Sequence, residues 1–174
     1  MSIDLDEAKT NGVLSEDLLA KTPGFPIETL KKAKGPVVMI ECAQEIPCNP
    51  CETVCPSGAI TVGEPITNLP IVDAEKCSGC GMCIAICPGL AVFLADMNQR
   101  EGCGSVSFPY EYLPVPKEGD VVKALDREGK VVCDAKVERV LSPPKYDMTK
   151  VVTILVPVEH VNTVRGIERK KEVS

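Results

Sequence analysis

Four cysteines with close, regular spacing lie near the middle of the chain. Cys77, Cys80, Cys83 and Cys87, the last followed by Pro88, match the pattern C-x2-C-x2-C-x3-C-P. The two-residue gaps let one loop place three thiolates around an iron–sulfur cubane, and a fourth cysteine on a helical turn points toward a second cluster. A zinc ribbon would instead need two separated C-x2-C knuckles. The spacing therefore favours a [4Fe–4S] cluster over zinc.

An upstream segment repeats most of this pattern. A shift of 32 positions, from residue 48 to residue 80, superimposes two sets of equivalent residues: Ile40 on Val72, Cys48 on Cys80, Cys51 on Cys83, Cys55-Pro56 on Cys87-Pro88, and Ala59-Ile60 on Ala91-Val92. Each half predicts a short strand, a cysteine loop, a short helical turn after Cys-Pro, and a second strand. Two such halves predict a unit with a pseudo-twofold axis.

One ligand position does not repeat, because Glu45 stands where a counterpart of Cys77 is expected. Glu45 could itself bind iron, although a carboxylate is a harder ligand than these clusters prefer. Without a fourth ligand, a three-iron cluster could form. The interpretation we favour is that Cys42, at the end of the apolar run "PVVMIEC", supplies the thiolate through the spacer of residues 43–47. The remaining alternative is that Cys42 packs as a small hydrophobic residue.

In these motifs, residues 37–98 resemble the bacterial two-[4Fe–4S] ferredoxins. The resemblance implies that the ligands cross over between the halves. One cluster would be bound at the cysteine set that we call site 1, and the other at site 2. Site 1 comprises Cys42, Cys48, Cys51 and Cys87, with Cys42 as the expected fourth ligand; site 2 comprises Cys77, Cys80, Cys83 and Cys55.

The first cysteine loop, "IECAQEIPCNPCETVCPSGAI", also resembles that of ferredoxin-type subunits of FAD-dependent amino-acid dehydrogenases. Those complexes act on proline, hydroxyproline or sarcosine-like substrates. The resemblance implies that FAD is bound by flavoprotein partner subunits and that this chain relays electrons to a further acceptor within a hetero-oligomer. A free-standing soluble ferredoxin is the alternative. The chain shows no nucleophile–base pair, phosphate-binding glycine loop or dinucleotide fingerprint, so we expect no catalytic residue.

The regions around the repeat predict an α+β protein. Residues 1–36 form an N-terminal extension, expected to dock a partner, with helical candidates at residues 15–21 and 27–34. Residues 99–160 predict a small all-β module, a barrel or sandwich, with a hairpin turn at residues 126–129 and a strand at "KVVTILVP". Cys133 is expected to pack in its core and Cys103 to lie in a flexible loop. A charged tail follows at residues 161–174.

The charge of −6 is concentrated in the cysteine repeat. Residues 37–98 have Lys76 as their one basic residue against seven carboxylates. This distribution argues against a nucleic-acid partner, because no basic face exists to release counterions. The acidic surface is either simply solvated or a docking face for a basic protein. No apolar run approaches a membrane span, and the start lacks the layout of a signal peptide. We therefore expect a cytoplasmic protein, whose cysteines stay reduced.

Overall fold

The computed structural model describes residues 8, 10, 12–100 and 102–169. An antiparallel sheet with the strand order β1-β4-β5-β8-β7-β6-β9 runs through this part of the chain, and β2 pairs separately with β3. The strands are β1 (Val37–Ile40), β2 (Ile60–Thr61), β3 (Ile71–Val72), β4 (Val92–Arg100), β5 (Cys103–Tyr110), β6 (Val121–Leu125), β7 (Val131–Leu141), β8 (Lys150–Pro157) and β9 (Gly166–Ile167). The helical segments include α2 (Glu16–Leu19), α3 (Ile27–Leu30), α4 (Pro50–Val54), α5 (Met82–Ile86), η1 (Pro144–Tyr146) and η2 (Val158–His160).

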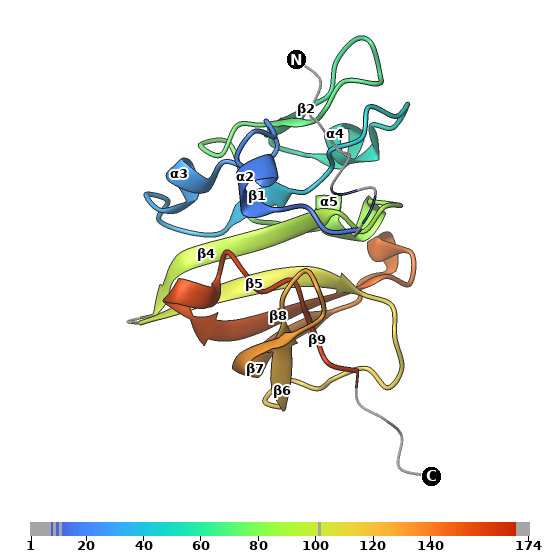
Figure 1. Cartoon of the computed structure of the whole chain (residues 1–174). Coiled ribbons are helices and arrows are strands. Elements are labelled where there is room, and N and C mark those ends of the chain that lie inside the picture. Colours follow the sequence, from blue (N-terminus) through green and yellow to red (C-terminus); the bar gives the residue numbers. More distant parts are fainter. Residues whose placement is uncertain (1–7, 9, 11, 101, 170–174) are drawn as a thin grey trace.

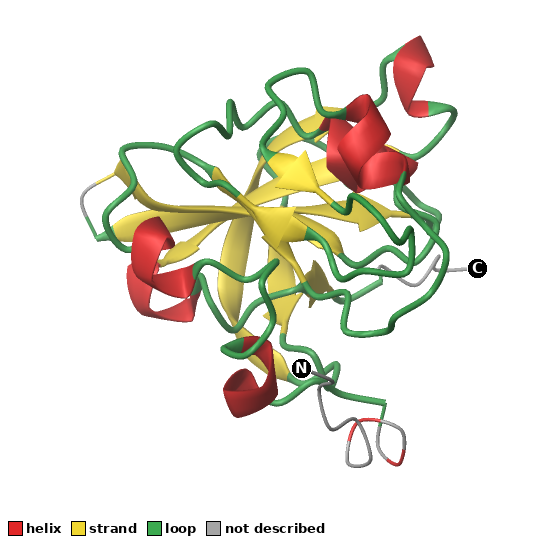
Figure 2. Ribbon diagram, turned by 90° about the horizontal axis from the view of Figure 1, so that it is seen from above, coloured by secondary structure: helices red, strands yellow, loops and turns green. Residues whose placement is uncertain are grey.

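The large sheet lies between two hydrophobic cores. Successive side chains of a strand point to opposite faces, and in β1 and the first half of β4 both faces are buried. On one face, Met39 and Phe93 join the main core together with Leu19 of α2 and Leu30 of α3. On the other face, alternate residues of the same strands join a second core beside the cysteine loops. In Figure 1, β4 and β5 lie between α4, α5 and β2 on one side and the later strands of the same sheet on the other. In Figure 2 the strands occupy the middle of the molecule and the helices its outside.

Strand β4 crosses the predicted boundary between residues 98 and 99. It pairs with β1 along one edge and with β5 along the other. The strands of the predicted β module therefore form one sheet with two strands of the cysteine repeat and do not make a sheet of their own. The physical reason is that a buried strand edge needs partners for its N–H and C=O groups. The division into four regions stays a prediction, although side chains from the N-terminal region are buried in the main core.

The pairing of the short strands reflects the internal repeat. Ile40 is opposite Val92, and Ile60 is opposite Val72. The shift of 32 takes residue 40 to residue 72 and residue 60 to residue 92. The two strand pairs are therefore equivalent, with the first-half residue of one pair corresponding to the second-half residue of the other. The same shift takes α4 at residues 50–54 onto α5 at residues 82–86. These relations support the predicted pseudo-twofold arrangement.

Helices α4 and α5 lie before the Cys-Pro pairs, and only single hydrogen-bonded turns follow these pairs, so the prediction of a helical turn after them is wrong. Helix α4 is followed by Cys55 and α5 by Cys87, and both cysteines have extended backbones with ψ of 109° and 113°. A proline ring disfavours the helical conformation of the preceding residue. Each proline therefore ends the turn at the cysteine before it.

Several local predictions are confirmed. Helix α2 begins after Ser15, whose hydroxyl accepts a hydrogen bond from the backbone N–H of Leu18. The β6–β7 hairpin turns where Gly129 has a φ of 79°, and β8 coincides with "KVVTILVP". Cys103 is a correction: it begins β5 and does not lie in a flexible loop. None of the described helices is long and apolar enough to cross a membrane.

Candidate iron–sulfur sites

Site 1 draws its cysteines from three segments. Cys42 lies two residues after β1, Cys48 lies before α4, Cys51 lies inside α4, and Cys87 follows α5. Burial, together with the neighbouring thiols of Cys87, Cys48 and Cys42, raises the pKa of Cys51 to about 11. Burial likewise raises the pKa of Cys42, with added contributions from Cys87 and Cys48. Since these effects need proximity, the fold brings the four thiols together, whereas Glu45 is exposed.

Site 2 combines three cysteines of the second half with one of the first. Cys77 and Cys80 lie in the loop before α5, Cys83 lies inside α5, and Cys55 follows α4. Burial, together with the thiols of Cys77, Cys80 and Cys55, raises the pKa of Cys83 to about 12. Cys55 therefore lies near the second loop.

Cys55 also receives hydrogen bonds to its sulfur. The backbone N–H of Ala59 donates to Sγ at 3.2 Å, and the Ser57 hydroxyl lies 3.6 Å from it. Burial would raise the pKa of Cys55, but Ser57 and the backbone amides outweigh that effect and lower the pKa. These donors stabilise the thiolate form that a metal centre requires.

The donor sets fit iron–sulfur clusters. Each set consists of soft sulfur ligands, and all the cysteines concerned are free of disulfides. Thiolates crowded in half-buried surroundings repel one another, and positive iron among them would relieve that repulsion. Among the described residues, no three or more His, Cys, Asp or Glu side chains converge on a single metal ion. A cubane makes a different demand, because each of its thiolates binds a different iron atom.

A buried ion cluster that the sequence reasoning missed adjoins site 1. Glu41 Oε1 accepts hydrogen bonds from Arg127 Nη2 at 2.7 Å and from Arg165 Nε at 2.5 Å. Burial would raise the pKa of Glu41, but Arg165 and Arg127 outweigh it and hold the pKa below its ordinary value. Burial lowers the pKa of Arg165 to about 10, although Glu41 opposes this shift. These ion pairs connect Glu41, the residue before Cys42, to Arg127 after β6 and Arg165 before β9.

A second contact from the C-terminal half reaches site 2. The hydroxyl of Tyr146, in η1, donates a hydrogen bond to the backbone oxygen of Cys80 at 3.1 Å. Tyr146 is only 4% exposed, and a Cβ added to Gly81 would lie 3.4 Å from its hydroxyl. The Tyr146 side chain therefore packs directly on the second cysteine loop. Its partners are 66 residues away in the chain, so no local sequence signal could have indicated this contact.

Comparison with known proteins places the iron–sulfur chemistry in the same part of the chain. Residues 41–96 match the family model described as "LdpA Fe-S cluster-binding domain". One subunit of an ion-translocating oxidoreductase complex from Methanosarcina acetivorans is 49% identical over 49 residues, which cover 28% of this chain and 17% of the relative. An uncharacterized ferredoxin from Methanocaldococcus jannaschii is 38% identical over 68 residues, covering 38% of this chain and 40% of the relative.

A third similar protein is the polyferredoxin-like subunit of an aliphatic sulfonate oxidoreductase from Pyrococcus furiosus. It is 39% identical over 54 residues, which cover 31% of this chain and 28% of the relative. The matches thus span less than half of these relatives' lengths. No solved structure matches the chain significantly. Together the matches identify residues 41–96 as a ferredoxin-type, iron–sulfur cluster-binding domain with an electron-transfer role.

Proposed function

We propose that this chain is an electron-transfer subunit that binds one [4Fe–4S] cluster at site 1 and another at site 2. The observation that supports the proposal is that α4 and α5 pack together, and that each carries a cysteine of one proposed set and is followed by a cysteine of the other. Neighbouring thiols of the same set also raise the pKa of Cys42, Cys51 and Cys83. Cys42, and not the exposed Glu45, completes site 1 in this assignment. When bound, each cluster would take up and release one electron at a time.

The helices α4 and α5 connect the two sites. Cys51 of site 1 lies inside α4, and Cys55 of site 2 follows that helix; Cys83 of site 2 lies inside α5, and Cys87 of site 1 follows it. The two helices also pack against each other. Each of these two short helices thus connects a proposed ligand of one site to a proposed ligand of the other. This arrangement supports a short path for electron transfer between the two clusters.

The second core shields both sets of ligands. Cys42, Cys51, Cys55, Cys77 and Cys87 pack against a core that includes Ile40 and Ile84, both fully buried, and Cys83 is itself a member. This packing keeps water from one side of each site and orients the cysteine side chains. The chain's own residues therefore hold the ligands, limit solvent access and set the spacing, which are the protein's tasks in an electron carrier.

For the partner, we infer the flavoprotein subunit of an FAD-dependent amino-acid dehydrogenase, in a cytoplasmic hetero-oligomer. The first cysteine loop supports this inference. One similar protein is named as a subunit of an oxidoreductase complex and another as a polyferredoxin-like subunit of an oxidoreductase, which supports an assembly of some kind. The ferredoxin relative favours the second candidate, a free-standing electron carrier.

Iron and sulfide analysis of the anaerobically purified protein tests the cluster assignment. We expect about eight irons and about eight sulfides per chain, with EPR signals from two clusters after reduction. A Cys133→Ser variant should keep the full iron content, because Cys133 lies on β7 and outside both sites. About four irons per chain, or zinc in place of iron, would refute the proposal. Flavin analysis of the native preparation and identification of copurifying chains test the partner inference separately.

A further inference from the structure

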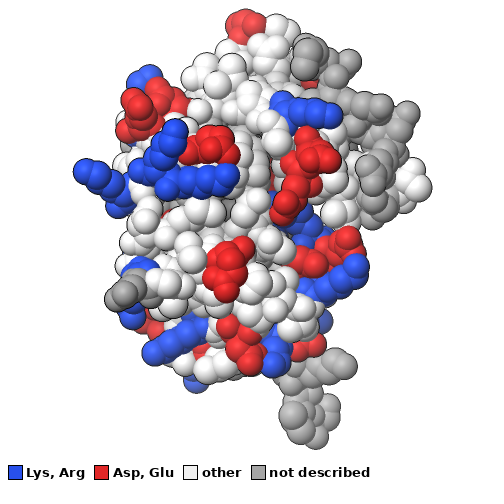
Figure 3. All heavy atoms as spheres, turned by 60° about the vertical axis from the view of Figure 1, so that its left-hand side comes forward, with Lys and Arg blue, Asp and Glu red and all other residues white. Residues whose placement is uncertain are grey.

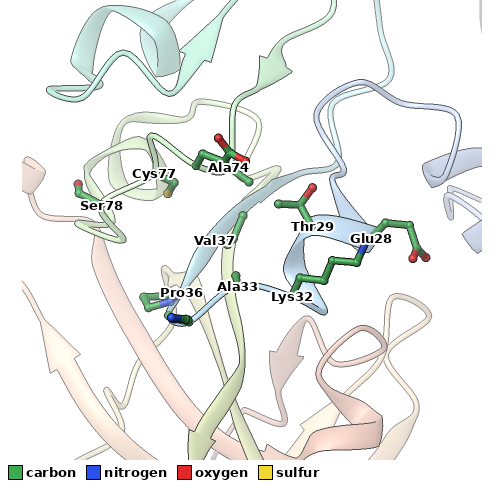
Figure 4. A pocket seen from close by; sticks show the side chains of 12 residues that line it. Glu28, Thr29, Lys32, Ala33, Pro36, Val37, Ala74, Cys77 and Ser78 are labelled. Atoms are coloured by element: carbon green, nitrogen blue, oxygen red, sulfur yellow. The ribbon is translucent and has the colours of Figure 1, made fainter.

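A pocket of about 640 Å³ opens beside Cys77 of site 2. Its walls come from α3 with the turn that follows it, from the start of β1, and from residues 74–78. Figure 4 shows Cys77 and Ser78 on one side of the pocket, with Thr29 and Lys32 across from them. The volume lies within the range of small-molecule sites, which is about 300–1,000 Å³. A molecule bound here would lie against a proposed ligand of site 2.

The walls of the pocket are held in place by contacts to the rest of the fold. A Cβ added to Gly79 would lie 2.5 Å from Cγ of Pro36, so Pro36 packs tightly on the second cysteine loop. The side-chain amide of Asn98 donates to the backbone oxygen of Ala33 at 2.6 Å. These contacts join the turn after α3 both to site 2 and to β4. The pocket is therefore preformed and does not need to be built by its ligand.

The charge at this pocket differs from the charge around site 1. Lys32 and Lys34 line it together with Glu28 and Glu75, and Lys31 pairs with Glu28 at 2.7 Å. Because Lys31, which does not line the pocket, neutralises Glu28, the lining side chains that remain are Lys32 and Lys34 against Glu75, a side-chain charge of +1 (2 − 1). Basic side chains lie among acidic ones on the face that includes α3 (Figure 3).

The charged groups in the loops of site 1 are acidic, although the buried Glu41, Arg127 and Arg165 also lie beside it. Glu45 lies in its first loop and Glu52 in α4. The backbone N–H of Cys48 donates to the backbone oxygen of Ile66, which places the segment that contains Glu64 beside this loop. An anion approaching the protein would thus be repelled at site 1 and attracted at the lysines of the pocket.

We propose that the pocket beside Cys77 is an electron-exchange site for a small anionic carrier, whose carboxylate, phosphate or sulfonate group is attracted by Lys32 and Lys34. The proposal rests on the proposed function, since it needs a cluster at site 2. In the exchange, one electron would pass from a reduced cluster held at site 2 to the oxidised carrier, with no bond formed or broken. The pocket holds the carrier near the Cys77 sulfur during this step.

Binding can be tested with the redox-inert, paramagnetic anion [Cr(EDTA)]⁻ and the cluster-loaded, oxidised protein. We expect it to broaden the backbone amide NMR signals of Thr29 and Lys32 selectively. The Lys32→Gln/Lys34→Gln double variant should lose this broadening. A matched Lys117→Gln/Lys136→Gln variant, which removes two exposed lysines near β6 and on β7, should keep it. Broadening that is absent, that survives the first double variant, or that the cation [Cr(NH₃)₆]³⁺ reproduces would overturn the proposal.

Electron exchange can be tested by stopped-flow oxidation of the reduced protein with [Co(EDTA)]⁻, in which Co(III) accepts one electron and becomes Co(II). At low ionic strength the Lys32→Gln/Lys34→Gln variant should react about tenfold more slowly than the wild type. The difference should narrow as salt screens the lysines, and the Lys117→Gln/Lys136→Gln variant should match the wild type. If the Lys32→Gln/Lys34→Gln variant binds both clusters but keeps the wild-type rate, the pocket proposal is refuted while the proposed function stands. If iron analysis finds no clusters, the proposed function fails.

Discussion

Replacing Glu41 by Gln should destabilise the protein because it removes the carboxylate that contacts both buried arginines, Arg127 and Arg165. The side chains of Glu41, Arg127 and Arg165 are 10%, 12% and 5% exposed. Removing one partner of a buried ion pair costs about 3–5 kcal/mol. Gln keeps the shape and one carbonyl oxygen, and Arg165 stays 5.2 Å from the ring centroid of Phe93. We therefore expect the lower end of that range, about 3 kcal/mol.

The corresponding fall in the melting temperature is about 6–12 °C, since 1 kcal/mol corresponds to about 2–4 °C in a protein of this size. Circular dichroism of the cluster-loaded protein under anaerobic conditions measures it. Glu128→Gln is the matched control, because it also removes one negative charge, but from an exposed ion pair with Lys130. Glu128 lies in the β6–β7 turn, next to Arg127. That variant should melt like the wild type, as exposed ion pairs contribute little.

A double variant tests whether the uncompensated arginine charge causes the fall in melting temperature. In Glu41→Gln/Arg165→Met, one of the two uncompensated charges is replaced by an apolar side chain, so the double variant should melt above Glu41→Gln. If Glu41→Gln melts together with the Glu128→Gln control, or if the double variant melts below the single one, the account of this ion cluster is wrong.

Three further changes probe the sites and the loops that carry them. Cys42→Ala should remove iron from site 1 or leave a three-iron cluster there, detected by iron analysis and EPR, whereas Glu45→Gln should leave both clusters intact; two normal [4Fe–4S] signals in Cys42→Ala would reject the ligand assignment. Tyr146→Phe removes a buried hydrogen bond to the second cysteine loop, so we expect a loss of about 1 kcal/mol and an altered EPR signal from site 2 alone; an unchanged spectrum would mean that the contact does not orient the ligands. Gly79→Ala should lower the melting temperature more than Gly102→Ala, because both glycines have positive φ (67° and 70°) but only at Gly79 would the new Cβ collide with a neighbour; equal effects would show that the loop shifts without cost.

The cysteine pattern could be interpreted from the sequence because it depends on short separations along the chain. The C-x2-C-x2-C-x3-C-P spacing predicted an iron–sulfur domain, and the match of residues 41–96 to an iron–sulfur family model confirms that much. The β6–β7 hairpin was likewise predictable from a local turn with glycine at a positive φ. Which eight cysteines bind the clusters, and whether Cys42 is among them, stays a prediction.

Other features depend on residues far apart in the chain, so only the tertiary structure decided them. The repeat predicted a helical turn after each Cys-Pro, whereas α4 and α5 end at these pairs, because proline disfavours a helical conformation of the cysteine before it. Strand β4 pairs along both edges, which joins the repeat to the later strands in one sheet. Arg127 and Arg165 meet Glu41 across 86 and 124 residues, and Lys32 reaches the pocket at Cys77. Short-range spacing thus determined which chemistry the cysteines can perform, whereas long-range packing decided which charges surround each site.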